Sequence, residues 1–268
     1  MAAQFLTPTI VQKIGLYDPI SLAEMDGVKL MNRTDAKFLV PLKMLPTLLE
    51  DLRPYYRLLE INGHRMCDYE TLYFDTPDLR FYHDHQAGRL NRYKIRQRKY
   101  VHSNTIFTEV KFKNNKGRTI KTRLLNQRPV NTTLTDETNA FLSLQTPVDP
   151  TTLTPVLRVD YTRITLVSRT TAERLTMDLN LTFHNEASRK SYEQLVVAEV
   201  KQDSLKHSRF LDLMKKYQLR QGSLSKYCLG VISLNKTVKH NRFKAKLNHV
   251  LKINARCTSL PENSHYSA

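Results

Sequence analysis

The chain has 268 residues, of which 40% are hydrophobic and 25% charged, so a sizeable core is available and wholesale disorder is excluded. Its 42 lysines and arginines outnumber 25 acidic residues, and the resulting net charge of +17 favours a polyanionic partner: nucleic acid, anionic lipid or a phosphate chain. The seven glycines form neither G-x-x-x-x-G-K nor G-x-G-x-x-G, which argues against Walker-type and Rossmann-type nucleotide sites.

The first half of the chain reads mainly as strands. The predicted elements are, in chain order, the short helix Ser21–Asp26, the strand Leu30–Val40, the helix Leu42–Leu52 and the strands Asp68–Phe74, Arg89–Tyr100, Thr105–Lys113 and Arg118–Leu125. Asn114–Gly117 is predicted to form the hairpin turn between the last two strands. His83, Asp84 and His85 have a metal-like spacing, but they follow a strand in a polar stretch, so we expect a solvated turn there.

The second half mixes helices and strands. The predicted elements are the helix Thr135–Leu144 with Thr135 as its N-cap, the strands Leu157–Val167, Arg174–Phe183 and Leu195–Lys201, and the helices Ser208–Leu219 and Ser223–Asn235. Many strands with a few helices indicate an α+β fold with a closed antiparallel sheet. We expect a lead-in over residues 1–29, one domain over 30–235 and a basic tail over 236–268.

The cysteines and the N-terminal sequence indicate in which cellular compartment the protein works. Cys67, Cys228 and Cys257 lie far apart and form no C-x-x-C pair, which argues against a disulfide framework and fits a reducing cytosol. Met1–Ile20 lacks a basic segment followed by an apolar run, and no stretch approaches the roughly 20 apolar residues needed to span a bilayer. We therefore expect a cytoplasmic protein, or one held at a membrane by something else.

Charged side chains gather on one face of several predicted strands. Alternation gives these sets: Arg92, Lys94, Arg96 and Arg98; Glu109, Lys111 and Lys113; Lys121 and Arg123; Arg174, Thr176, Asp178 and Asn180; Glu199 and Lys201. For any single strand, a half-exposed sheet is the simpler interpretation. Together, however, facing like charges would destabilise a sheet unless it gathers a polyanion. In a closed barrel, that charged face would become the lumen.

The ordered motifs resemble those of the VTC-type polyphosphate polymerase domain, in the triphosphate tunnel metalloenzyme (CYTH-like) superfamily. The matching segments are Leu30–Val40, Thr71–Leu79, Gly88–Tyr100, Phe107–Lys111, Arg158–Arg163, Glu173–Asp178, Ala198–Lys201 and Ser225–Gly230. Each is weak alone, but they occur in family order over nearly all of residues 30–235. The resemblance implies an eight-stranded antiparallel β-barrel, flanked by helices, whose basic lining holds a phosphate chain and whose acidic residues hold Mn²⁺ or Mg²⁺.

The resemblance also implies roles for individual residues. The residues that look like the family's phosphate-contacting catalytic set are Lys37, Arg96, Arg98, Lys111, Arg163, Arg174 and Lys226. Further substrate contacts are expected from Lys121, Arg123, Lys201 and Ser225, and metal contacts from Glu199 and Glu109. Alternation alone would not select Arg163, because it shares a face with Val159 and Tyr161, opposite Arg158 and Asp160; that assignment rests on the resemblance.

One departure separates the branches of the superfamily. Hydrolases and cyclases typically open with E-x-E-x-K on the first strand, whereas the aligned residues here are Arg33, Thr34, Asp35, Ala36 and Lys37. The loss of a metal carboxylate and the gain of a cation favour the polymerase branch. The implied reaction transfers the γ-phosphoryl group of ATP to a growing inorganic polyphosphate chain, a step that depends on positioning and charge neutralisation.

Two other functions stay open at this point. One is a metal-dependent hydrolase of tripolyphosphate or organic triphosphates on the same fold. The other is a non-catalytic module that binds polyphosphate or nucleic acid; net charge alone favours nucleic acid, but the common nucleic-acid motifs are missing and specific binding is not expected. The resemblance further implies a membrane-protein partner and a location at the inner face of a membrane.

The basic tail carries a possible helix. Phe243, Leu247, Val250 and Leu251 fall at helical spacing among lysines and arginines. Three interpretations are compatible with this pattern: an amphipathic helix that touches lipid, an acidic partner or emerging polyphosphate; a frayed tail; or a helix docked on the barrel.

Overall fold

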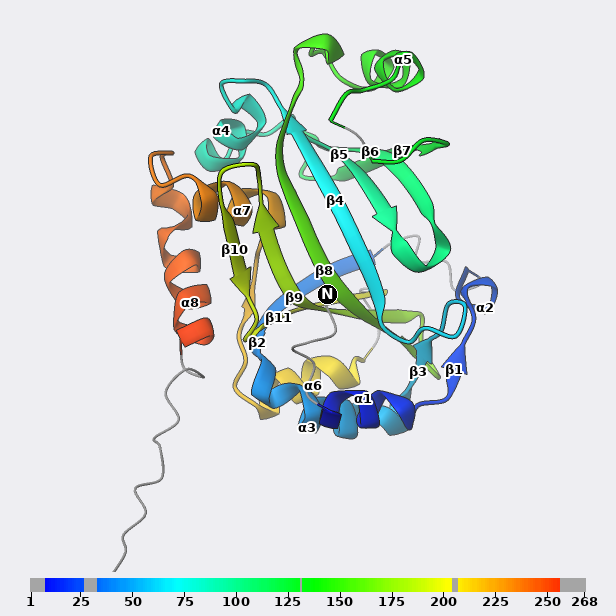
Figure 1. Cartoon of the computed structure of the whole chain (residues 1–268). Coiled ribbons are helices and arrows are strands. Elements are labelled where there is room, and N and C mark those ends of the chain that lie inside the picture. Colours follow the sequence, from blue (N-terminus) through cyan, green and yellow to red (C-terminus); the bar gives the residue numbers. More distant parts are fainter. Residues whose placement is uncertain (1–7, 27–32, 131, 204–206, 256–268) are drawn as a thin grey trace, which may run out of the picture.

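The computed structural model describes residues 8–26, 33–130, 132–203 and 207–255. It has the α+β fold expected from the sequence: a large antiparallel sheet with helices packed around it (Figure 1). Residues 30–32 of the first predicted strand and residues 256–268 of the predicted tail lie outside the described residues.

All eight predicted strands form, and they are consecutive neighbours in one sheet. The strands are β1 (Pro19–Ile20), β2 (Arg33–Pro41), β3 (Tyr56–Leu59), β4 (Cys67–Asp75), β5 (Arg92–Tyr100), β6 (Thr105–Lys113), β7 (Thr119–Asn126), β8 (Thr154–Ser168), β9 (Glu173–His184), β10 (Arg189–Tyr192), β11 (Leu195–Asp203) and β12 (Gln221–Gly222). The sheet order is β12-β2-β11-β9-β8-β4-β5-β6-β7, while β10 pairs with β9, β3 with β8, and β1 runs parallel to β3.

The sheet is not closed by backbone pairing, unlike the barrel expected from the sequence. The path ends at β12 and β7, and the described residues show no pairing between these two ends. A physical reason is visible at β2, where Gln221 and Gly222 of β12 pair with Phe38 and Lys37 and so occupy part of the edge that closure would need. The sheet is nevertheless curled, as its charge contacts demonstrate below.

Some of the helices begin directly after a side chain that caps them. They are α1 (Pro8–Gly15), α2 (Leu22–Asp26), α3 (Leu45–Leu52), α4 (Arg80–Ala87), α5 (Asp136–Gln145), α6 (Arg209–Lys216), α7 (Lys226–Leu234) and α8 (Lys244–Ala255), with short 3₁₀ turns at Leu42–Met44, Arg53–Tyr55, Val101–Ser103, Pro150–Thr152 and Asn241–Phe243. Thr135, Ser208 and Ser225 each accept a backbone N–H from the first turn of the helix that follows. None of the helices among the described residues is long and apolar enough to cross a membrane.

The expected solvated turn at His83–His85 is wrong, because these residues lie in helix α4. The Asp75 carboxylate accepts the backbone N–H groups of Phe81 and Tyr82, and thereby satisfies donors that the start of a helix leaves unpaired. Phe81 and Tyr82 are both buried, so the helix also has an apolar face against the sheet.

Helices cover both faces of the sheet. On the outer face, α1, α3 and α6 pack against Phe38, Val196 and their neighbours, as expected from the sequence. The inner face is different: Leu39 and Val197 alternate with those residues and pack with α7 and α8. Figure 1 shows α1, α3 and α6 grouped together, with α7 and α8 apart from them. The inner face is thus apolar where α7 and α8 lie, and charged elsewhere.

Candidate functional site

The charged strand faces predicted from the sequence line the inner face of the curled sheet. We call this surface the charged face; it comprises Asp35, Lys37, Lys94, Arg96, Arg98, Glu109, Lys111, Lys121, Arg123, Arg163, Arg174, Asp178, Glu199, Lys201 and, from α7, Lys226. Strand register explains the arrangement, because residues directly opposite each other in an antiparallel pair share a face. Glu199 lies opposite Lys37, and Asp178 lies opposite Arg163.

Electrostatic influence between distant strands indicates that the charged face is curled. Burial and the positive charges of Arg96 and Arg98 hold the pKa of Lys111 well below its usual range, with Arg96 the strongest influence, and Lys201 adds to the effect. Lys111 is on β6 and Lys201 on β11, and four strands separate β6 from β11 in the sheet order. A charge on one can reach the other only because the sheet curls until its two halves face each other.

Three carboxylates of the charged face are each held between two cations. The groups are Glu199 with Lys37 and Lys201, Asp178 with Arg163 and Lys226, and Glu109 with Arg96 and Lys121. The remaining cations exceed the remaining carboxylates, so the face carries a surplus of positive charge. A polyanion would offset that surplus.

The Glu199 group joins β2 and β11. Its carboxylate lies 2.6 Å from Lys37 Nζ and 3.2 Å from Lys201 Nζ, and Lys201 is also 3.8 Å from Asp35. Burial alone would raise the pKa of Glu199, but Lys201 and Lys37 outweigh it and lower the pKa to about 2. The Glu199 side chain keeps 20% of its surface exposed, so a ligand can reach this ionised carboxylate.

The Asp178 group joins the sheet to helix α7. Arg163 donates from Nε (2.6 Å) and Nη2 (2.9 Å) to the two carboxylate oxygens, and Lys226 Nζ donates to the second of them. The burial of Asp178 would raise its pKa, but Arg163 and Lys226 lower it below the usual range. Lys226 is the first residue of α7, so this contact fixes the N-terminus of α7 against the charged face.

The Glu109 group is the most enclosed. The Glu109 side chain is fully buried; Arg96 donates to it from Nε at 2.6 Å, and Lys121 contacts its other oxygen. Arg96 also donates to the Tyr73 hydroxyl at 3.0 Å. Although burial would raise the pKa of Glu109, the nearby cations, Arg96 first, lower it below the usual range. Glu109 is therefore a buried anion that orients Arg96 and Lys121.

An aromatic pair supports further cations. The rings of Tyr69 and Tyr161 stack at 5.1 Å; Arg98 lies 5.6–5.7 Å from their centroids, Arg163 lies 4.9–5.3 Å from them, and Lys226 lies 4.7 Å from that of Tyr161. Arg98 Nε also donates to Thr71 Oγ1 at 3.2 Å. In the part of the chain that the structure describes, no carboxylate lies within ion-pair distance of Arg98, which leaves its outer nitrogens available to an anion.

The other predicted residues lie towards the ends of the charged face. Arg174 is paired in register with Lys201, and Arg123 is exposed and stacks on Phe107 at 4.6 Å. Ser225 caps α7 and accepts a hydrogen bond from Lys94 Nζ at 2.9 Å.

The sequence analysis did not identify Asp178, Lys94 or three tyrosines as site residues. Asp178 shares the alternating face of Arg174, and Lys94 that of Arg96, so alternation was a usable signal for both. No comparable signal marked Tyr69, Tyr73 and Tyr161, which are read from sequence as ordinary core residues.

The donor chemistry of the charged face suits a hard divalent cation only in part. No group of three His, Cys, Asp or Glu side chains that could hold a metal ion occurs among the described residues. Carboxylate oxygens are the donors that Mg²⁺ and Mn²⁺ prefer; the side chains of Glu199 and Asp35 are 20% and 39% exposed, whereas Glu109 is fully enclosed. The protein would thus supply few ligands, and phosphate oxygens and water the rest.

Comparison with known proteins gives one strong match. A family model described as the VTC domain matches residues 32–235. The comparison with curated proteins found no match.

Solved structures give weaker similarities. A candidate adenylate cyclase from Bacillus halodurans is 15% identical over 73% of this chain and 96% of its own, with a TM-score of 0.44. A Hippeastrum protein reported to have a dominant triphosphatase activity is 12% identical over 78% of this chain and 100% of its own, with a TM-score of 0.42. A Pyrococcus horikoshii protein is 14% identical over 75% and 99%, with a TM-score of 0.42. At these values the similarities carry no information about activity.

Proposed function

The chain belongs to the VTC domain family, and we propose that it is a polyphosphate polymerase that transfers the γ-phosphoryl group of ATP to a growing inorganic polyphosphate chain. The observation that supports this most is the gathering of cations from many strands and from α7 on the inner face of one curled sheet, where they outnumber the carboxylates. Such a face matches the linear, repeating negative charge of a phosphate chain. On the same proposal, the protein works in the cytoplasm with a membrane protein as partner.

The chain's own residues would act by positioning and charge neutralisation, which phosphoryl transfer chiefly needs. Arg98 and Arg163 would bind phosphate oxygens through their planar guanidinium groups, which remain charged when buried. Lys111 and Lys226 would add point charges from opposite sides of the face. Arg96, held by Glu109 and Tyr73, would keep a fixed orientation and so bind phosphate with little loss of side-chain freedom.

Glu199 would hold Mn²⁺ or Mg²⁺ on this proposal; Glu109, the second carboxylate predicted from the sequence, is fully buried between Arg96 and Lys121 and would have to leave them to reach an ion. When bound, such an ion would neutralise negative charge on the phosphate groups. Glu199 is suited to this because its low pKa keeps it ionised at neutral pH and part of its surface is exposed. Lys37 and Lys201 would then be released towards the substrate.

Hydrolysis of tripolyphosphate is the main alternative, and Asp35 bears on it. At this position hydrolytic relatives carry a glutamate that serves a metal, whereas the Asp35 carboxylate here lies 3.8 Å from Lys201. Arg33 also stands in place of the first of the two glutamates, which removes a carboxylate that could position water, and this favours transfer to a phosphate chain.

The test is incubation of the full chain with ATP and Mn²⁺ or Mg²⁺, followed by gel detection of long polyphosphate and assay of free phosphate. We expect polymer, and no polymer when the ions are chelated. Rapid release of free phosphate with no polymer at any metal concentration would assign the protein to the hydrolases instead. Binding of polyphosphate that needs no metal, together with no turnover of ATP, would instead identify the protein as a non-catalytic binding module.

A further inference from the structure

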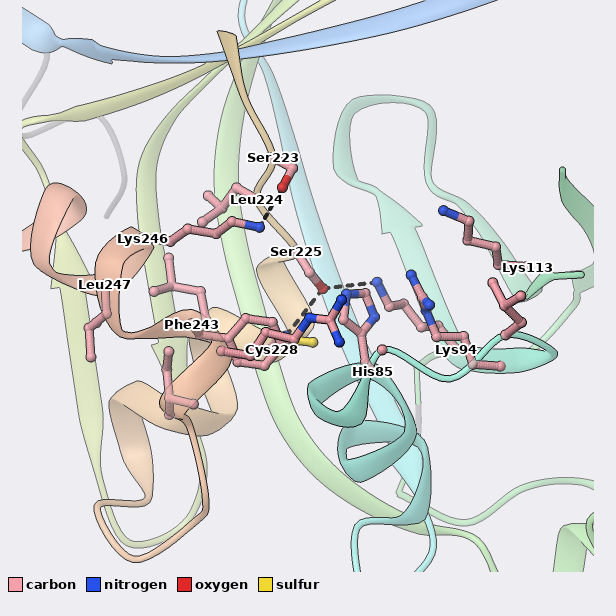
Figure 2. A pocket seen from close by; sticks show the side chains of 16 residues that line it. His85, Lys94, Lys113, Ser223, Leu224, Ser225, Cys228, Phe243, Lys246 and Leu247 are labelled. Atoms are coloured by element: carbon pink, nitrogen blue, oxygen red, sulfur yellow. Dashed lines mark hydrogen bonds between the residues drawn. The ribbon is translucent and has the colours of Figure 1, made fainter. Parts of the chain in front are cut away.

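A basic cavity lies beside the charged face, between the ends of β5 and β6 and the helices α4, α7 and α8. Its volume is about 490 Å³. Figure 2 shows cations entering it from two directions. Arg92, Lys94 and Lys113 come from the strands, and Arg242 and Lys246 come from the segment that follows α7.

The charge of this cavity is not balanced by the protein. No carboxylate lines it, and among the described residues none of its five lysines and arginines lies within ion-pair distance of one. Lys94 donates to Ser225 Oγ and Lys246 to Ser223 Oγ (Figure 2). Arg242 donates to the Ala87 carbonyl at 2.9 Å. The cations are thus held in place by neutral acceptors only, in contrast to the paired cations of the charged face.

A neutral histidine in the same wall carries an unsatisfied buried atom. His85 Nδ1 is buried and has no hydrogen-bond partner among the residues that the structure describes. Burial, together with Lys94 and Arg92, lowers the pKa of His85 to about 3, so the ring is uncharged at neutral pH. Buried polar atoms are normally hydrogen-bonded, so this wall of the cavity holds one polar atom that the described residues leave unpaired.

The cavity continues the charged face without a break. Arg92 and Lys94 extend the alternating row of Arg96 and Arg98 along β5, and Lys94 and Arg92 lie opposite Lys111 and Lys113 of β6. A phosphate chain that lies along this row therefore leads directly from the charged face into the cavity.

The C-terminal segment supplies two cations to the cavity, and one of them packs against the end of α4. Arg242 and Lys246 follow residue 235, where the match to the family model ends. Gly88 makes room for Arg242, because a Cβ atom at this position would lie 1.8 Å from Arg242 Nη1. The backbone of Gly88 also has a φ of +74°, which favours glycine. The guanidinium group thus lies directly over Gly88 and is held at the end of α4 by its hydrogen bond to the Ala87 carbonyl.

We infer that this cavity is a second phosphate subsite, completed by the segment after residue 235, which binds the phosphate groups of a ligand that extends past the charged face. For the identity of the ligand, inorganic polyphosphate, the inference rests on the proposed function. A nucleoside triphosphate could present the same phosphate chemistry, and the test below distinguishes the two.

The test measures binding to the full chain by calorimetry, with tripolyphosphate, ATP and long-chain polyphosphate as separate probes. The variant is Lys246→Gln combined with Arg242→Gln. The control is Lys252→Gln, which changes a similarly exposed lysine on the same helix that does not line the cavity. We expect about tenfold weaker binding of long polyphosphate in the double variant, because two charge-assisted contacts are lost, and unchanged binding of tripolyphosphate and in the control.

Weaker binding of ATP in place of polyphosphate would also support the subsite and would identify the nucleotide as its source of phosphate. Unchanged binding of both ligands, or an equal loss for tripolyphosphate, would overturn the inference. Lys113→Gln alters the cavity from β6 without touching α8, so a fold defect in the C-terminal segment cannot mimic the result. Wild-type protein that makes no polymer while the variants still lose polyphosphate binding would reject the proposed function and keep the subsite.

Discussion

Asp178 is the residue on which the geometry of the charged face most depends. Its carboxylate is 3% exposed and joins Arg163 of the sheet to Lys226 of α7. A buried ion pair contributes little net stability when it is complete, but the loss of one partner leaves a buried charge uncompensated. The carboxylate is thus required chiefly to let two cations coexist when no ligand is bound.

Replacement of Asp178 by asparagine should therefore destabilise the ligand-free protein by about 3 kcal/mol. The two remaining cations would then need an external anion, so saturating polyphosphate should recover more stability in the variant than in the wild type. Urea unfolding with and without polyphosphate measures both effects. A variant as stable as the wild type would mean that solvent already compensates Arg163 and Lys226.

Glu199 gives a second prediction, on pH. Its folded-state pKa is lowered to about 2, so its ion pairs stabilise the fold above the unfolded pKa of about 4.3, and that stabilisation is lost as the pH falls towards 2. The difference in unfolding free energy between wild type and Glu199→Gln should accordingly shrink between about pH 5 and pH 2. The measurement is urea unfolding at several pH values in that range, and a constant difference would show that Lys37 and Lys201 do not depend on the charge of Glu199.

For single residues, the alternation of charged and apolar side chains along the strands predicted most of the charged face. It failed where a helix packs on the inner face. Arg163 follows Val159 and Tyr161 on an inner face that is apolar because α7 packs on it, so the charged residues Arg158 and Asp160 misleadingly suggested the opposite face. The packing of α7 against the inner face of the sheet is a tertiary interaction, and the alternation of residues along a strand does not predict it. The role of Arg33 stays a prediction, since its side chain lies outside the described residues.

Among the elements, α7 determines where Ser225 and Lys226 enter the charged face. Its close approach to the sheet is possible because residue 230 is glycine: a Cβ atom there would lie 2.7 Å from side-chain atoms of both Leu157 and Phe183. Cores tolerate such overpacking poorly.

Gly230→Ala should destabilise the protein by about 1–3 kcal/mol despite the higher helix propensity of alanine, which is worth about 1 kcal/mol. It should also weaken polyphosphate binding, because α7 shifts and carries Lys226 with it. Gly15→Ala is the matched control, since a Cβ atom at Gly15 would meet nothing within 4 Å. Equal stability of both variants would show that Leu157 and Phe183 can move aside at no cost.

Strands were easier to predict from the sequence than the segments between them. Alternation and turn residues marked β5, β6 and β7, whereas α4 was missed because its start is capped by Asp75, a residue of the preceding strand, rather than by a local capping motif. The two-residue strand β12 has no sequence signal at all, and it is the element that takes up part of the edge of β2. Closure of the barrel could not be judged without it. The interpretation of the tail as a docked helix is confirmed for α8, whose Val250 and Ile253 are buried.

The whole molecule combines a net charge of +17 with an inner face on which cations exceed carboxylates. The facing like charges repel one another and so destabilise the ligand-free fold. The apolar clusters on either side of the sheet offset this repulsion. A ligand that removes this repulsion stabilises the folded state to the extent that it binds the folded chain more tightly than the unfolded one.

Long polyphosphate should therefore raise the free energy of unfolding by about 2.7 kcal/mol at a free concentration 100 times its Kd. The effect should shrink as salt is added, because screening weakens exposed charge contacts and counterions compete for them. Polyglutamate of matched charge is the control: it offers carboxylates spaced along a bulky backbone, which the enclosed face should exclude, so stabilisation by polyphosphate should exceed it at equal salt. Thermal unfolding monitored by circular dichroism makes the comparison directly. Equal stabilisation by both polymers would mean that the exposed surface, and not the curled inner face, gathers the polyanion, and it would remove the physical basis for a phosphate chain held inside the sheet.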